Sequence, residues 1–404
     1  MSAIAEPAID TADRLAKRNA LVLAVAQALA GGNSIVIVST AGIVGTSLAG
    51  KALATVPVST YVLGMWMATL PVGAIAKRFG RIASFELGAL CGAIAGVLCS
   101  LAVLHASFAL LCLGTLFGGF YAAVHQSYRF ASTDTASDAF KPRAISWVMA
   151  GGMFSAFVGP QLVIFTKDLW PPYLFAASYL AQAGVAILSG VVLLATRIPR
   201  PVQTGRSVGD ARPLAEIFRQ PRLIVAVVCG VASYSMMNLV MTSAPVAMLD
   251  CQHSVTDATL GLQWHVIGMF APSFFTGWLI ARFGTDRMAG VGLTIIALGA
   301  VIALCGITIW HFWAALVLLG VGWNFAFVGA TALVTQCHRP SERNKVQAVN
   351  DFLVFGSMAI SSFSSGKLLA SFGWSMVAEV VLPAVGIAAV LLVAVNLLAR
   401  PRTA

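Results

Sequence analysis

The stretch GAIAKRFG at residues 73–80 recurs as GWLIARFG at residues 277–284. Both copies follow a long apolar run and keep the pattern GxxxxRFG at an offset of 204 residues, close to half of the 404-residue chain. A pattern that returns at the equivalent place in each half indicates an internal repeat. The sequence therefore predicts two related halves.

The composition excludes an ordinary soluble enzyme. Apolar residues make up 59% of the chain and charged residues 10%, with a mean hydropathy of +0.88, whereas a soluble domain carries about 25% charged residues. Apolar stretches of about 20 residues, the length of one helical bilayer crossing, recur along the chain. We therefore expect an all-α integral membrane protein with twelve transmembrane helices in two six-helix bundles.

The longest polar segment divides the expected helices into two sets of six. We place them at residues 20–47, 55–76, 84–104, 107–129, 144–166, 172–196, 223–248, 258–281, 288–310, 312–336, 346–370 and 374–398. This predicts an N-terminal bundle at 1–196, a cytoplasmic linker at 197–222 and a C-terminal bundle at 223–404. The first apolar run is too long for a cleaved signal peptide, so it is expected to remain as helix 1.

The basic residues predict the orientation. All but Lys51, Lys167 and Lys367 of the 25 Lys and Arg residues fall in the two tails and in alternate loops. The positive-inside rule then places both termini in the cytoplasm of a bacterial inner-membrane protein. The net charge of +10 is explained by this topology, and no nucleic-acid partner is expected. The seven cysteines include no CxxC spacing, so no disulfide framework is expected.

The repeated motif resembles the signature of the major facilitator superfamily, G-x-x-x-D-R-x-G-R after helix 2. The matching residues are Gly73, Arg78, Gly80 and Arg81, with Gly277, Arg282 and Gly284 in the second copy. Lys77 and Ala281 replace the acid, which in the family helps to latch the cytoplasmic face; the latch is therefore absent or uses another carboxylate such as Glu86. The resemblance covers all twelve helices and implies alternating access around a central site between the halves.

Methionine and histidine residues on helices 7 and 8 form a candidate binding site. Met237 and Met241 are one helical turn apart, as are His265 and Met269. Counting outward from the loop between the helices places Met237 and Met269 level near the bilayer midplane, the depth at which transporters of this architecture bind substrate. Thioether sulfur and imidazole nitrogen are neutral donors that favour Cu(I). The same spacing also fits packing, because methionine commonly fills gaps between helices.

This Met-x3-Met and His-x3-Met order resembles the signature of the CcoA-like bacterial copper importers, a branch of the same superfamily. The resemblance implies import of copper from periplasm to cytoplasm, where it supports assembly of cbb-type cytochrome c oxidase. It makes Met237, Met241, His265 and Met269 copper ligands. Related members of the branch are thought to carry other cargo, such as riboflavin. Copper would be the transported substrate, and no prosthetic group is expected.

Other polar residues have predicted roles along the same path. We expect an entrance at Met248, Cys251 and His253, an exit at His125 and Met149, and proton coupling at Asp351. Local packing or hydrogen bonding is the alternative for His125 and Met149. An ion pair with Lys77 or Arg78 is the alternative for Asp351, and an ordinary loop is the alternative for Cys251 and His253.

Three functions are consistent with the sequence, and the absence of GxSxG, P-loop lysine and HExxH motifs argues against an enzyme. The leading hypothesis is a monomeric copper importer that delivers the ion to a cytoplasmic recipient. The main alternative is a proton-coupled transporter of a drug or a vitamin such as riboflavin, sensitive to changes at Asp351 or at aromatic residues such as Trp264 and Trp323. A third is a receptor or assembly factor for a copper enzyme.

Overall fold

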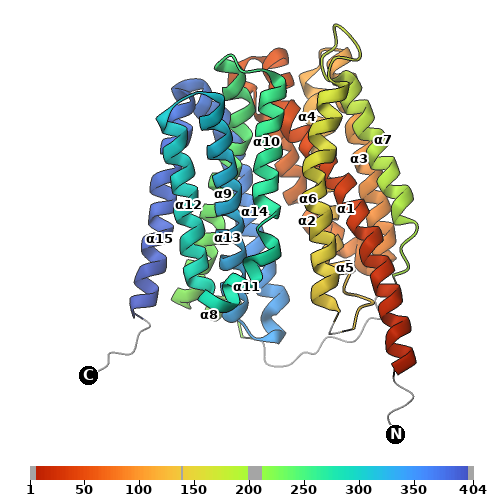
Figure 1. Cartoon of the computed structure of the whole chain (residues 1–404), viewed down its shortest axis with the longest axis vertical. Helices are drawn as coiled ribbons and strands as arrows, with labels where there is room; N and C mark the ends of the chain where they lie inside the picture. Colours follow the sequence, from red (N-terminus) through yellow and green to blue (C-terminus); the bar gives the residue numbers. More distant parts are fainter. Residues whose placement is uncertain (1–5, 138–139, 199–211, 399–404) are drawn as a thin grey trace. The chain divides into compact units, whose positions relative to one another are not determined.

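The computed structural model describes residues 6–137, 140–198 and 212–398, most of which are helical (Figure 1). The helices of the first half are α1 (Glu6–Ala49), η1 (Lys51–Leu53), α2 (Val56–Phe79), α3 (Arg81–Leu104), α4 (Phe108–His125), α5 (Tyr128–Ala131), α6 (Lys141–Thr166) and α7 (Ala176–Leu193). Those of the second half are α8 (Leu214–Ile217), α9 (Pro221–Asp250), α10 (Val255–Phe270), α11 (Ser273–Phe283), α12 (Thr285–Cys305), α13 (Ile309–Gln336), η2 (Pro340–Glu342), α14 (Arg343–Glu379) and α15 (Val381–Leu398).

The helix lengths and hydropathies confirm an all-α membrane fold. In the described chain, ten helical segments are long and apolar enough to cross a membrane, and α10 with α11 makes an eleventh span bent by 40°. One of the ten, Lys345–Leu398, has 54 residues, about 80 Å of helix against a hydrocarbon core of about 30 Å. It contains two spans because Gly373 leaves helical geometry, with φ 78° and ψ −176°. Counted this way, the described chain has the twelve predicted spans.

The chain divides into two compact units, unit 1 at Met1–Gln203 and unit 2 at Thr204–Ala404. Unit 1 holds the spans α1, α2, α3, α4, α6 and α7, and unit 2 holds α9, α10 with α11, α12, α13, α14 and α15. The predicted linker, 197–222, lies largely in 199–211, outside the described residues; its final part includes the short helix α8.

The repeated motif forms the same tight corner in both units. Gly80 lies between α2 and α3 with φ 95°, and Gly284 lies between α11 and α12 with φ 89°. Residues with a Cβ atom rarely adopt this positive φ, so the last glycine of each copy is required by the backbone. A Cβ added at Gly73 or Gly277 would meet nothing within 4 Å, so close packing does not require these first glycines.

In unit 1, α2 and α4 approach each other through glycines. A Cβ on Gly119 would lie 2.0 Å from the Tyr61 carbonyl oxygen, and one on Gly64 would lie 2.2 Å from the Leu116 carbonyl oxygen. Both contacts are with backbone atoms, which cannot rotate away. The two helices therefore pack at this distance only because these positions carry no side chain.

In unit 2, α10 and α13 make the corresponding contact. A Cβ on Gly320 would lie 2.4 Å from the His265 carbonyl oxygen, and one on Gly268 would lie 2.8 Å from the Val317 carbonyl oxygen. His265 follows Tyr61 by the 204-residue offset of the repeated motif, as Gly268 follows Gly64. The internal repeat thus extends from the motif to a shared helix contact.

A buried ion pair holds the end of the linker against unit 2. Glu342 is the last residue of η2, which follows α13 and precedes α14 in the chain. Its side chain is fully buried. Its Oε1 accepts from Nε of Arg212 at 2.7 Å, and its Oε2 accepts from Nη2 of Arg212 and the backbone N–H of Arg339, both at 2.9 Å. These donors lower the pKa of Glu342 to about 2. The pair fixes Arg212, the first described residue after position 198, to the loop between two spans.

We expect Glu342→Gln to lower the melting temperature of the detergent-purified protein by several degrees at neutral pH, because the amide loses the charge-assisted bonds to Arg212. The pKa of Glu342 is depressed from its ordinary 4.5 to about 2. Its stabilisation is therefore complete above pH 4.5 and is lost as the pH falls toward 2. Scanning fluorimetry should show the difference from wild type shrinking over that window. Glu379→Gln, at an exposed position, is the control, and equal melting temperatures at neutral pH would contradict the assignment.

Candidate functional site

Four aromatic rings from three helices of unit 2 form one cluster. Tyr234 of α9 meets Trp323 and Phe327 of α13 edge-on, with ring centroids 5.2 and 4.9 Å apart, and lies 5.9 Å from Phe355 of α14. Trp323 and Phe327 stack at 5.3 Å with 10° between their planes. Tyr234 and Trp323 are each 8% exposed, and the other two rings are half-buried. Aromatic side chains can stack against flat ligand rings, so this aromatic cluster is a candidate contact for such a ligand.

Uncharged polar atoms without partners lie on the helices that carry the cluster and on α10. The buried atoms that make no hydrogen bond in the described part of unit 2 include Ser235 Oγ and Thr242 Oγ1 of α9, His265 Nε2 of α10 and Trp323 Nε1 of α13. Ser235 directly follows Tyr234, and Trp323 belongs to the cluster itself. Buried polar atoms cost free energy unless they are hydrogen-bonded, so these atoms are candidates for bonds to a polar ligand or to water.

The four predicted copper ligands are largely buried in unit 2. Met237, His265 and Met269 are 1%, 0% and 9% exposed, and Met241 is half-buried. His265 Nδ1 donates to the Leu316 carbonyl oxygen at 2.7 Å, and the Met269 carbonyl oxygen accepts from Nδ2 of Asn324 at 2.7 Å. Both hydrogen bonds join α10 to α13. These interactions of His265 and Met269 therefore serve helix packing.

The internal repeat gives a physical reason for the His265-x3-Met269 spacing. The equivalent residues in unit 1 are Tyr61 and Met65. In unit 1, Gly119 lies against the Tyr61 carbonyl oxygen and the Met65 backbone nitrogen. In unit 2, Gly320 lies in the same way against His265 and Met269. The four-residue step thus marks one turn of a packed helix in both units, and only unit 2 has an imidazole there.

The predicted entrance residues have other interactions. Met248 is fully buried in α9. His253 Nε2 donates to the Ile307 carbonyl oxygen at 2.8 Å, and its ring packs edge-on against Phe312. Cys251 is a half-buried free thiol whose pKa is raised by burial and by the neighbouring Asp250 carboxylate. A raised pKa leaves less thiolate, the form that binds metal ions.

Both ring nitrogens of the predicted exit residue His125 are engaged. Gln27 Nε2 lies 3.3 Å from Nδ1, and Ser34 Oγ lies 3.2 Å from Nε2. An amide nitrogen can only donate, so Nδ1 accepts and Nε2–H donates to Ser34. His125 therefore has a hydrogen-bond partner at each ring nitrogen, and its exit role stays a prediction. Met149 is half-buried in α6.

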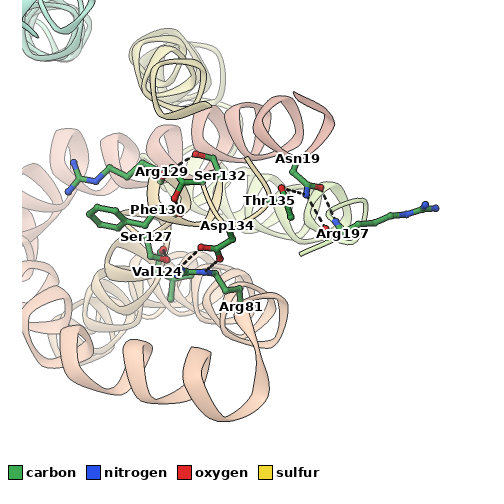
Figure 2. A network of polar contacts seen from close by, with 11 residues as sticks. Asn19, Arg81, Val124, Ser127, Arg129, Phe130, Ser132, Asp134, Thr135 and Arg197 are labelled. Carbon is green, nitrogen blue, oxygen red and sulfur yellow. Dashed lines mark hydrogen bonds and ion pairs between the residues drawn. The ribbon is translucent and has the colours of Figure 1, made fainter. Parts of the chain in front are cut away.

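The motif arginine Arg81 binds an acid that the sequence reasoning missed. Arg81 Nε donates to Asp134 Oδ2 at 2.5 Å, and Nη2 donates to Oδ1 at 3.2 Å (Figure 2). Asn19 of α1 is bonded to Thr135 and, in both directions, to the backbone of Arg197 (Figure 2). The loop after α5 is thereby tied to the start of α3 and to α1, and α1 is tied to the segment after α7. Arg81 of the motif thus pairs with a carboxylate outside the motif.

The remaining motif arginines lie over aromatic rings. Arg78 lies 5.2 Å from the ring centroid of Phe79, and Arg282 lies 5.6 Å from that of Trp278. Asp351, the predicted coupling carboxylate, is half-buried on α14 and accepts from Nδ2 of Asn350 at 3.2 Å. Trp264, one of the aromatics considered for an organic substrate, is 44% exposed, in contrast to Trp323.

Comparison with known proteins gives a family and several relatives. A sequence model described as Major Facilitator Superfamily matches residues 21–264 and 226–404. The riboflavin transporter RfnT of Brucella anthropi is 49% identical over 391 residues, covering 96% of this chain and 98% of that protein. The MFS-type transporter YddS of Bacillus subtilis, described as uncharacterized, is 30% identical over 335 residues, covering 79% of this chain and 77% of that protein.

Solved transporter structures share the fold. A D-xylose-proton symporter has a TM-score of 0.71 at 14% identity and covers 94% of this chain and 95% of its own. A mutant of the nucleoside transporter NupG has a TM-score of 0.71 at 15% identity and covers 95% of this chain and 100% of its own. At these identities the likeness shows the fold and nothing about the substrate.

The predicted copper import is wrong. A relative that matches nearly the whole chain at 49% identity is a transporter of riboflavin, and the resemblance to the CcoA-like importers finds no support among the relatives. The His265-x3-Met269 part of the pattern has a structural explanation, because these residues occupy a packed turn that recurs in unit 1 as Tyr61 and Met65. A direct role in substrate binding remains a prediction for four residues, Met237, Met241, His265 and Met269. The substrate that they would bind is no longer expected to be a metal ion.

Proposed function

The chain belongs to the major facilitator superfamily, and from this premise we propose that it transports riboflavin across the cytoplasmic membrane. The observation that carries the proposal is the 49% identity to the riboflavin transporter RfnT along 96% of the chain. Identity at this level over both bundles covers every span that could line a transport path. The alternative hypothesis from the sequence, transport of a vitamin such as riboflavin, thus replaces the hypothesis of copper transport.

The chemistry of unit 2 supports this substrate. Riboflavin joins a planar tricyclic ring, edged by carbonyl and imide groups, to a ribityl chain with several hydroxyls, and it is uncharged at neutral pH. A flat ring suits the aromatic cluster of Tyr234, Trp323, Phe327 and Phe355. Its polar edges suit uncharged partners such as Trp323 Nε1, Ser235 Oγ and His265 Nε2.

The orientation is proposed from charge. The basic loops and tails favour cytoplasmic termini in a bacterial inner membrane. We infer import, with riboflavin entering from the periplasmic side. The proposal needs no metal ion and no prosthetic group, and a single chain forms the functional transporter.

Riboflavin uptake tests the proposal directly. The chain should restore growth of a bacterial strain that can neither make nor import riboflavin, at vitamin concentrations on which the empty vector does not grow, and should raise radiolabelled riboflavin uptake. Lumiflavin, which keeps the ring, should compete, whereas FMN should compete poorly because the aromatic cluster and its polar atoms carry no positive charge for a phosphate. Copper chelation should leave uptake unchanged. Normal membrane abundance without riboflavin uptake would overturn the assignment.

A further inference from the structure

A carboxylate in unit 1 lies within a span and has an unsatisfied oxygen. Glu86 is five residues beyond Arg81, the first residue of α3, so it lies about 8 Å along the helix. Its Oε1 is buried and has no hydrogen-bond partner, and no ion pair of the described residues includes it. A charged side chain at such a position is costly, and ionisable residues inside membrane spans commonly mark proton or ion pathways.

Hydroxyl groups of three other helices interact with this carboxylate or with one another beside it. Glu86 interacts electrostatically with Tyr121 of α4 and Tyr128 of α5, and both tyrosines interact with Ser189 of α7. Tyr121 is 1% exposed and Tyr128 is 0% exposed, and neither hydroxyl lies within hydrogen-bond distance and angle of a partner. A Cβ on Gly190 would lie 3.1 Å from Glu86 Oε2, so the backbone of α7 comes close to the carboxylate.

The basic groups on and near the helices around this site have other interactions or are exposed to solvent. Arg81, on the same helix, pairs with Asp134. On α2, Arg78 lies over the ring of Phe79, and on α5, Arg129 lies over the ring of Phe130. Lys77, near the end of α2, is exposed. On α4, the imidazole of His125 is held by its two hydrogen bonds. Among the described residues, the elements packed on Glu86 therefore offer it hydroxyls and not an ion pair.

His125 extends the cluster toward α1. Its ring packs edge-on against Tyr121 and Tyr128, with centroids 6.2 and 6.4 Å away. Its nitrogens reach Gln27 and Ser34 of α1. The Oε1 of Gln27 is also buried without a partner. Titratable and hydroxyl groups thus form a continuous set from α3 through α4 and α5 to α1.

We propose that Glu86, with the hydroxyls of Tyr121 and Tyr128, is a proton-binding site that couples transport to proton movement. One proton adds to Glu86 Oε1 when the site is sealed from water and returns to water when the site opens, with no other bond changed. In the sealed state the neutral acid avoids an unpaired charge. In the open state the tyrosine hydroxyls and water stabilise the carboxylate. The site carries a proton, and its coupling to a substrate rests on the proposed transport of riboflavin.

Proteoliposomes separate coupling from substrate binding. With purified Glu86→Gln, a neutral isostere of the protonated acid, riboflavin uptake driven by a pH gradient should fall at least about tenfold. Exchange of radiolabelled for internal unlabelled riboflavin without a gradient should stay within about twofold, because it needs no net proton movement. Glu379→Gln, at an exposed position in unit 2, is the matched control and should behave as wild type in both assays.

A second readout needs no substrate. Infrared difference spectra of the purified wild type should show the C=O band of a protonated carboxylic acid, and Glu86→Gln should lack it. Tyr121→Phe and Tyr128→Phe should shift the pH at which the band disappears. Undiminished gradient-driven uptake by Glu86→Gln, equal loss of uptake and exchange, or an unchanged infrared band would each overturn the proposal. If wild type moves no riboflavin, the proposed function fails, and the infrared comparison alone decides the proton site.

Discussion

Trp323→Ala should raise the KM for riboflavin uptake about tenfold, which corresponds to about 1.4 kcal/mol of lost stacking. Trp323 is the ring that stacks on Phe327 and meets Tyr234 edge-on, and its indole carries an unpaired N–H donor. Removing it takes away the largest flat surface of the cluster. Trp323→Phe keeps a ring and loses the donor, so it should raise KM only about threefold.

The control for this prediction is another tryptophan of the same helix. Trp310, at the start of α13, is 71% exposed, and Trp310→Ala should leave KM unchanged. Membrane abundance and melting temperature must be measured for each variant, because a cavity at a buried ring can cost about 3–5 kcal/mol of stability. Trp323→Leu fills part of that volume and should still show the raised KM. Wild-type KM in a well-folded Trp323→Leu protein would exclude stacking on Trp323.

The sequence predicts the fold well because bilayer crossing is a local property. A helix must bring about 20 apolar residues together in one stretch, and the chain shows this directly. The break between the last two spans, expected between 370 and 374, falls at Gly373. The helix expected at 258–281 is interrupted between Phe270 and Ser273, beside Pro272, which the apolar run alone does not reveal.

The candidate site was predicted less well because its contacts are not local. His265 and Met269 have a spacing that fits metal ligation and helix packing equally. The deciding hydrogen bond joins His265 to Leu316, 51 residues away. Tyr234, Trp323 and Phe355 are likewise brought together from three helices, and only Trp323 was considered from the sequence. The residues around Asp134 in the sequence do not indicate its bond to Arg81, which lies 53 residues earlier.

Gly320→Ala should disrupt the packing of α10 against α13 in unit 2. The added Cβ would lie 2.4 Å from the His265 carbonyl oxygen and 2.9 Å from the Met269 backbone nitrogen. Both atoms belong to the backbone of α10, so α10 and α13 must separate for the methyl group to fit. Overpacking of this kind costs about 1–3 kcal/mol, and a backbone clash belongs at the upper end. We expect a large fall in folded yield and melting temperature, with loss of riboflavin uptake.

The internal repeat supplies a paired test of the same argument. Gly119→Ala would place a methyl group 2.0 Å from the Tyr61 carbonyl oxygen in unit 1, so it should be at least as damaging as Gly320→Ala. Gly184→Ala and Gly386→Ala are the matched controls, because an added Cβ there meets nothing within 4 Å. Each control should be neutral or slightly stabilising, since alanine favours helix over glycine by about 1 kcal/mol. Normal yield and melting temperature for Gly119→Ala and Gly320→Ala would show that these helices do not depend on glycine contacts. In that event the shared turn of Tyr61 and His265 would lose its packing explanation.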